Sequence, residues 1–188
     1  MFHFRQYSAP KQRPLIMGIV NATGDSFSEG AASAAGSALD RALRLLDDGA
    51  DLLDIGGEST RPGAREIPPG EEIERILPVI RGIRSARPGA VLSVDTRKSE
   101  VAAAVLECGV EIINDVSLLR YDAALARVTA EGGAALVLSH SRGTPETMRS
   151  AEFHDYGDDV VAAVAAELAA AKQLALEAGV AEENLIVD

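Results

Sequence analysis

The chain has 188 residues, of which 47% are hydrophobic and 25% are charged, enough for one domain with a buried core. Its net charge of −11 argues against nucleic acid as the main partner, because binding phosphates needs a basic surface. A single cysteine, Cys108, excludes a disulfide framework and indicates a reducing compartment. Residues 1–14 lack the apolar core of a signal peptide, and charges interrupt the apolar stretch 160–180, so we expect a soluble cytoplasmic protein.

Six short apolar runs each lead into a polar residue. The runs are residues 16–20, 52–53, 91–94, 112–113, 136–138 and 185–187, followed by Asn21, Asp54, Asp95, Asn114, Ser139 and Asp188. Runs of this length are typical of parallel strands that are buried on both faces. Parallel strands bring their carboxyl ends to one rim, where ligands bind in α/β folds. We therefore expect the six polar residues to share a rim.

Helical patterns separate the runs, at residues 33–49, 69–84, 99–108, 121–131 and 158–178. Ser99 is the expected N-cap of the third helix, which ends at Gly109 and places Cys108 in its last turn as a buried structural thiol. The alternation of strand and helix fits a doubly wound sheet or a (β/α)₈ barrel. Polar residues at every strand end, and the lack of a GxGxxG motif, favour the α/β TIM-type barrel. About six of its eight strand–helix units are present, so 1–188 is expected to be one domain, truncated before the last strands.

Two loops carry residue types suited to anions. Asn21 opens a loop, 21–30, rich in Gly, Ser and Asp, where its side chain could meet a metal or a phosphate oxygen or simply form a turn. In the loop 56–63, two glycines allow close backbone approach, Thr60 offers a hydroxyl and Arg61 a fork of donors. Arg61 could equally be solvated.

Asp95, Asn114 and Asp188 could together receive a flat heterocycle with a 2-amino-4-oxo edge. A carboxylate accepts from a ring N–H and an exocyclic amine as a bidentate pair, and an amide both donates and accepts. Each Asp alone could instead cap a helix or support another residue. His140 is a candidate base, although a histidine at a strand end is more often a hydrogen-bonded structural residue. His3 and His154 are expected at the surface.

These loops together resemble one family, the dihydropteroate synthases. The resemblance lies in residues 17–28, 54–63, 93–96, 112–115, 139–145 with Met148, and 185–188, which match in order and spacing along nearly the whole chain. The first two motifs are long and highly specific.

The resemblance implies a pterin-binding barrel and a transferase of folate synthesis. Such enzymes condense 6-hydroxymethyl-7,8-dihydropterin diphosphate with 4-aminobenzoate to give 7,8-dihydropteroate. It implies that Asn21 contacts Mg²⁺ beside the diphosphate, and that Thr60 and Arg61 contact substrate. It implies that Asp95, Asn114 and Asp188 hold the pterin ring. Arg61 and Asp95 are the expected catalytic residues, the partners are small molecules, and a homodimer is compatible with the family.

The chain also departs from the family pattern. Gly24 replaces the usual Pro and Ala22 the usual Val, while Ser139 and Ser141 replace two methionines. It also stops before the Lys, Arg and His that the family carries on its last strands. Two alternatives therefore stay open: a pterin-binding barrel fragment without catalysis, and the pterin-binding domain of a corrinoid-dependent methyltransferase. The loops around Asp25 and Arg61 weigh against the methyltransferase.

Overall fold

The computed structural model describes residues 3–4, 7–8, 13–23 and 31–188, with side chains over 13–23 and 35–188. The expectations that concern residues 24–30, and the side chain of His3, lie outside this part of the chain. The elements are β1 His3–Phe4, β2 Tyr7–Ser8, β3 Met17–Asn21, α1 Ala31–Asp47, β4 Leu52–Gly56, α2 Pro69–Ala86, β5 Val91–Asp95, α3 Ser99–Glu107, β6 Ile112–Asp115, α4 Ala124–Glu131, β7 Ala135–Leu138, η1 Ala151–Phe153, α5 Val160–Glu177, η2 Glu182–Asn184 and β8 Leu185–Val187.

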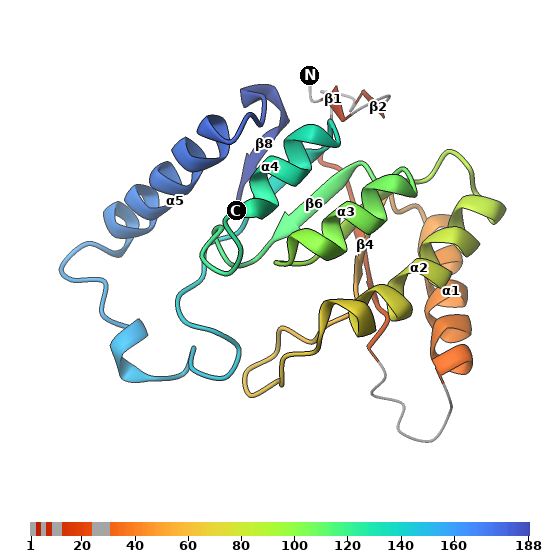
Figure 1. The fold of residues 1–188 in the computed structure, drawn as a ribbon, viewed down its shortest axis with the longest axis horizontal. Helices are drawn as coiled ribbons and strands as arrows, with labels where there is room; N and C mark the ends of the chain where they lie inside the picture. The colour runs from red at the N-terminus through yellow and green to blue at the C-terminus, as the bar shows by residue number, and fades with distance from the viewer. Residues whose placement is uncertain (1–2, 5–6, 9–12, 24–30) are drawn as a thin grey trace.

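Six parallel strands form one sheet in the order β3-β4-β5-β6-β7-β8. This consecutive order is that of a barrel wall, whereas a doubly wound sheet reverses its order at a switch point. In the described residues β3 pairs only with β4 and β8 only with β7, so the sheet is open between its first and last strands (Figure 1). The α/β expectation of an incomplete barrel with about six units is confirmed.

The two faces of the sheet differ. All five α-helices bury side chains in one large cluster against the strand residues that include Leu53, Leu92 and Leu136. The opposite face holds a smaller apolar cluster, in which Leu52, Val91 and Ile112 are buried. The second face is therefore the inner face of the partial barrel, and the helices cover the outer face. None of the helices in the described part of the chain combines the length and apolarity needed to cross a membrane.

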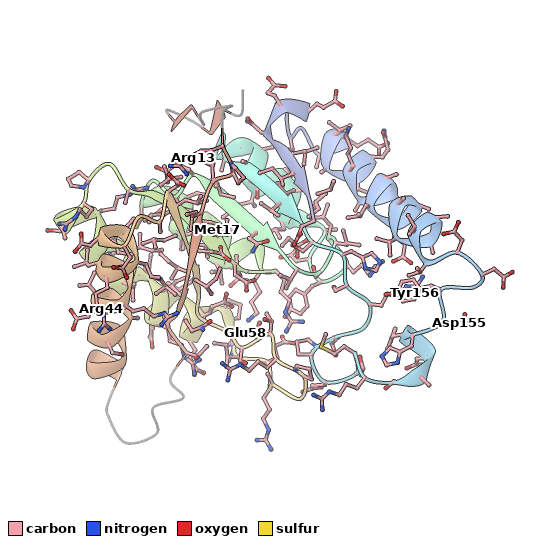
Figure 2. All side chains as sticks on the ribbon, turned by 180° about the vertical axis from the view of Figure 1, so that it is seen from behind. Arg13, Met17, Arg44, Glu58, Asp155 and Tyr156 are labelled. Carbon is pink, nitrogen blue, oxygen red and sulfur yellow. The ribbon has the colours of Figure 1, made fainter. Side chains whose placement is uncertain are left out.

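Several boundaries and burial assignments were wrong. The strand β3 is not buried on both faces, since Ile19 is 48% exposed and Met17 lies on the open edge of the sheet (Figure 2). Ser99 is the first residue of α3 and not its cap; its N–H is satisfied by the Asp122 carboxylate. The helix α4 begins at Ala124, not at residue 121, and the N–H of Ala124 also donates to the Asp122 carboxylate. Cys108 is half-buried, not buried.

Gly57 sets how closely α2 approaches the sheet. A Cβ at this position would stand 2.8 Å from Ile76 Cγ2 and 3.1 Å from the Glu72 backbone oxygen. We expect Gly57→Ala to lower the free energy of unfolding by about 1–3 kcal/mol, because the helix must move to relieve the overlap. Urea unfolding measures this. Gly36→Ala is the control: that exposed helical glycine has open space around it, and the substitution should stabilise the chain by about 1 kcal/mol.

Candidate functional site

The strand register brings four of the strand ends into one row. Asn21 pairs with Gly56, Gly56 with Asp95, and Asp95 with Asn114. Residues that pair across parallel strands point to the same side, and this row lies on the inner face, four residues beyond the buried Leu52–Val91 pair along the strands. Gly56 carries no side chain, and a Cβ there would stand 3.7 Å from Asp95 Cβ. A ligand can therefore approach Asp95 closely between Asn21 and Asn114.

Asp95 lies in an unusually acidic environment. Its carboxyl has no hydrogen-bond partner within the described residues, and four acidic neighbours surround it. Burial, together with the negative charges of Asp54, Glu72, Asp115 and Glu58, raises the pKa of Asp95 from 3.8 to about 8. A group with this pKa can gain or lose a proton near neutral pH when a ligand arrives. Asp95 is thus an acceptor of the row whose pKa is raised toward neutrality by burial and by nearby negative charges.

A second carboxylate, Asp54, supports the row from below. Asp54 lies two residues before Gly56 on β4 and therefore faces the same side. Its Oδ2 accepts from Asn114 Nδ2 at 3.1 Å, and burial raises its pKa. The amide nitrogen of Asn114 is therefore occupied by Asp54, and the amide oxygen remains available as an acceptor for another group. The other oxygen of Asp54 is buried as well, and the hydroxyl of Ser93, its cross-strand neighbour, acts against the rise in the pKa of Asp54 that burial causes.

Asp188 joins the row through Ser139. The Ser139 hydroxyl lies 3.2 Å from Asp188 Oδ2 and 3.4 Å from Asn114 Oδ1, so its single proton can serve either oxygen. The backbone reinforces this link, because Asp188 N–H donates to Leu138 and His140 N–H donates to the Asp188 carbonyl. The structure thus brings Asp95, Asn114 and Asp188 to one face of the sheet. Their binding roles stay a prediction.

The loop 58–67 carries Thr60 and Arg61 above this row. Both side chains are exposed, and no hydrogen bond or ion pair of the Arg61 guanidinium is found among the described residues. The tip of the loop is tied to the loop after β7, since Gly63 N–H donates to the Pro145 carbonyl at 2.7 Å. Beside this contact lies a pocket of about 210 Å³, lined by Thr60, Arg97, Ser117, Arg142, Pro145 and Met148 among others.

His140 is held by an ion cluster that the sequence did not reveal. Its Nε2 lies 3.1 Å from a carboxylate oxygen of Glu167 on α5, and Arg120 and Arg142 also pair with Glu167. Hydrogen bonds from Arg142 lower the pKa of Glu167 to about 2, and those from Arg120 and His140 add to the effect. This geometry matches a structural histidine that fastens the loop after β7 to α5. His154 is exposed, as expected.

Comparison with known proteins identifies the family of this chain. The model of the family described as "Pterin binding enzyme" matches residues 17–188. The chain belongs to the pterin-binding enzymes. A dihydropteroate synthase of Bacillus subtilis is 41% identical over 95% of this chain. The Xanthomonas albilineans enzyme solved with 4-aminobenzoic acid is 41% identical with a TM-score of 0.82 over 94% of this chain. The Burkholderia cenocepacia enzyme solved with 7,8-dihydropteroate is 42% identical with a TM-score of 0.82 over 97%.

This pterin-binding enzyme chain spans about 60% of those relatives: 59% of the Bacillus protein, 61% of the Xanthomonas chain and 60% of the Burkholderia chain. This chain is therefore homologous, over nearly all of its own length, to part of the dihydropteroate synthases. The six strands described above correspond to part of their barrels.

Sequence reasoning missed some residues that shape the site of this pterin-binding enzyme. Asp115, which follows Asn114, points to the outer face and is fully buried. Its carboxylate accepts from Ser117 N–H at 2.8 Å and from Leu119 N–H at 2.6 Å. These bonds stabilise two successive residues in the left-handed region, Leu118 (φ 54°) and Leu119 (φ 60°). The adjacent Asn114 and Asp115 could have indicated this, because consecutive side chains on a strand point to opposite faces of the sheet.

The residues present fit a hard cation only in part. Within the described ranges no group of three or more His, Cys, Asp or Glu is placed to hold a metal. Asn21 offers one amide oxygen at the rim, and its side chain is exposed. Magnesium commonly takes one or two protein oxygens and fills its other positions with water and phosphate. Asn21 therefore suits a metal that arrives with a phosphorylated substrate.

Proposed function

We propose that this chain is the pterin-binding part of a dihydropteroate synthase, which joins 6-hydroxymethyl-7,8-dihydropterin diphosphate to 4-aminobenzoate. The row formed by Asn21, Gly56, Asp95 and Asn114, with Asp188 linked to it through Ser139, is the observation that carries the proposal. It supplies two carboxylates and an amide at the mouth of the partial barrel, matching the donors and acceptors of an amino-oxo pyrimidine edge. The ligands in the related structures support the substrate class.

In this proposal the chain binds and orients, and it needs no covalent nucleophile. Asp95 accepts from a ring N–H and the 2-amino group of the pterin, and Asn114 and Asp188 complete the edge. With the ring fixed, the C–O bond to diphosphate breaks, and its electron pair leaves with the diphosphate. The amine nitrogen of 4-aminobenzoate forms the new C–N bond to the same methylene carbon and releases a proton. Holding both reactants in this geometry removes most of the entropic barrier.

Thr60, Arg61 and Asn21 are assigned to the anionic end. Arg61 is exposed and unpaired within the described residues, so its donors are available to the diphosphate or to the carboxylate of the second substrate. Asn21 would hold Mg²⁺, which neutralises charge on the leaving diphosphate when bound. The cytoplasmic location and any homodimer stay predictions.

A titration and a product assay test this proposal. Isothermal titration with 6-hydroxymethyl-7,8-dihydropterin should show binding, and incubation of its diphosphate with 4-aminobenzoate and Mg²⁺ should yield 7,8-dihydropteroate. Binding without product would favour a pterin-binding barrel that does not catalyse condensation. Failure to bind the pterin would overturn the proposal altogether.

Arg61→Ala should slow condensation more than it weakens pterin binding. We expect kcat to fall about 10–100-fold, because a donor to developing negative charge is lost, while the Kd for the pterin changes less than about threefold. Steady-state kinetics beside titration measure the two quantities. Arg65→Ala removes another exposed arginine of the same loop and serves as the control. The opposite pattern, weaker pterin binding with unchanged kcat, would contradict the assignment of this loop.

A further inference from the structure

Four charged side chains are buried together behind the candidate site. Glu58, Glu72, Arg97 and Lys98 are each at most 9% exposed. Lys98 Nζ lies 2.7 Å from Glu72 Oε2 and 3.2 Å from Glu58 Oε2, and Arg97 Nε lies 3.3 Å from the same Glu58 oxygen. The four residues come from three places: the start of the loop 58–67, the first turns of α2, and the segment after β5.

This cluster forms hydrogen bonds with the backbone of the loop 58–67 at its last residue, Ile67. The Ile67 N–H donates to Glu58 Oε1 at 2.9 Å, and the Ile67 carbonyl accepts from Lys98 Nζ at 2.8 Å. Both polar groups of one residue are therefore held by the buried ions. Because Glu58 begins the loop and Ile67 ends it, the two bonds close its base; Figure 2 labels Glu58 at this point.

Arg97 adds a second attachment beside the first. Its guanidinium stacks over the Tyr121 ring at 4.3 Å and lies 3.6 Å from Glu66 Oε2, and the Tyr121 hydroxyl donates to Glu66. The residue before Ile67 is thus also fastened. Between the two attached ends, Thr60 and Arg61 stay exposed at the rim.

Stability alone does not account for such a cluster. Replacing a buried ion pair by apolar residues of similar size is often neutral or stabilising, so buried charges are a poor means of holding a core together. An ammonium group can do what a methyl group cannot, which is to donate to the Ile67 carbonyl. Lys98 also stands three residues after Asp95, so one short segment carries both the ring acceptor and the loop attachment.

We propose that Lys98, with Glu58 and Glu72, is a positioning residue that fixes the base of the loop 58–67 and so sets where Thr60 and Arg61 stand relative to Asp95. The relevance of this position to catalysis rests on the proposed function, but the attachment itself does not. Loss of the attachment should free the loop while leaving the pterin row intact.

Limited trypsin digestion measures the attachment directly. The Arg65–Glu66 bond lies inside the loop, and the exposed Arg149–Ser150 bond, in the segment after β7, serves as an internal reference. In the double variant Lys98→Met/Glu72→Met, which removes a buried charge of each sign, we expect cleavage at Arg65 to accelerate at least about tenfold relative to Arg149. Lys172→Met breaks an exposed pair with Glu182 and should leave both rates unchanged.

A conservative variant separates positioning from packing. Glu58→Gln keeps an oxygen for Ile67 N–H and should keep Arg65 cleavage within about threefold of the parent chain, whereas Glu58→Leu should accelerate it. Titration of the double variant with 6-hydroxymethyl-7,8-dihydropterin should give a Kd within about threefold of the parent, with kcat for condensation lowered at least tenfold. Unchanged Arg65 cleavage in a folded double variant overturns the proposal. Absence of pterin binding to the parent chain would instead refute the proposed function.

Discussion

Asp95→Asn is expected to weaken binding of 6-hydroxymethyl-7,8-dihydropterin about 100-fold and, at the same time, to make the fold more stable. The amide keeps one acceptor but loses the charge and the bidentate geometry, which costs about 2–3 kcal/mol of binding free energy. Isothermal titration at pH 7 measures this loss. Asp40→Asn, which alters an exposed carboxyl on α1, is the control and should change neither property.

The stability gain follows from the raised pKa of Asp95. Between its ordinary pKa of 3.8 and its folded pKa of about 8, the folded chain holds a proton that the unfolded chain has released. Rising pH therefore favours the unfolded state across this window, and the penalty levels off above pH 8. An asparagine has no such penalty. We expect the unfolding free energy of the variant to be higher than that of the parent chain by up to about 4 kcal/mol at pH 7. At pH 4 the two unfolding free energies should be almost equal.

The same carboxyl predicts how pterin binding depends on pH. If the ring N–H and amine donate to an ionised Asp95, the affinity of the parent chain should rise with pH up to about 8, while that of the asparagine variant should not respond in this range. Titrations at pH 6, 7 and 8 on both chains test this. An equal response in both chains would show that Asp95 does not titrate on binding.

The rim could be predicted from the sequence because it depends on local patterns. Each apolar run is part of a strand, and for five of the six runs the polar residue after it falls within one residue of the strand's carboxyl end. The exception is Asp54, which was expected at the rim but lies in the middle of β4, so that Gly56 takes its place in the row. The pairing of Asn21, Gly56, Asp95 and Asn114 needed only the rule that consecutive βα units pair in order. The family resemblance then indicated which ligand, a pterin, these residues are expected to bind.

The support behind the rim could not be predicted, because it depends on distant packing. Nothing local marks Lys98 as buried: it sits in a polar segment, and its partners lie 40 and 26 residues away at Glu58 and Glu72. The cap of α3 was assigned to Ser99 on the same local grounds, but the carboxylate of Asp122 from the next unit satisfies that helix end. The exposure of Ile19 likewise follows from the edge position of β3, not from its composition.

Lys98→Met should be the most destabilising single substitution proposed for this chain. It removes the ammonium group that lies between Glu58 and Glu72 and leaves both carboxylates buried, with Glu72 losing the only hydrogen-bond partner found for its side chain in the described part of the structure. Breaking a buried ion pair in this way costs about 3–5 kcal/mol of unfolding free energy. Urea unfolding at pH 7 measures the loss, with Lys172→Met as the exposed lysine control.

The double variant decides how this loss is to be understood. With Glu72→Met added, an uncompensated charge is removed and the apolar pair can pack between α2 and the sheet, so the unfolding free energy should return to within about 1 kcal/mol of the parent chain. If it does, the large effect of Lys98→Met reflects the stranded Glu72 carboxylate, and the ion pair adds little net stability. A double variant as unstable as the single one would instead show that Lys98 stabilises the fold through its bond to the Ile67 carbonyl, which both variants lack.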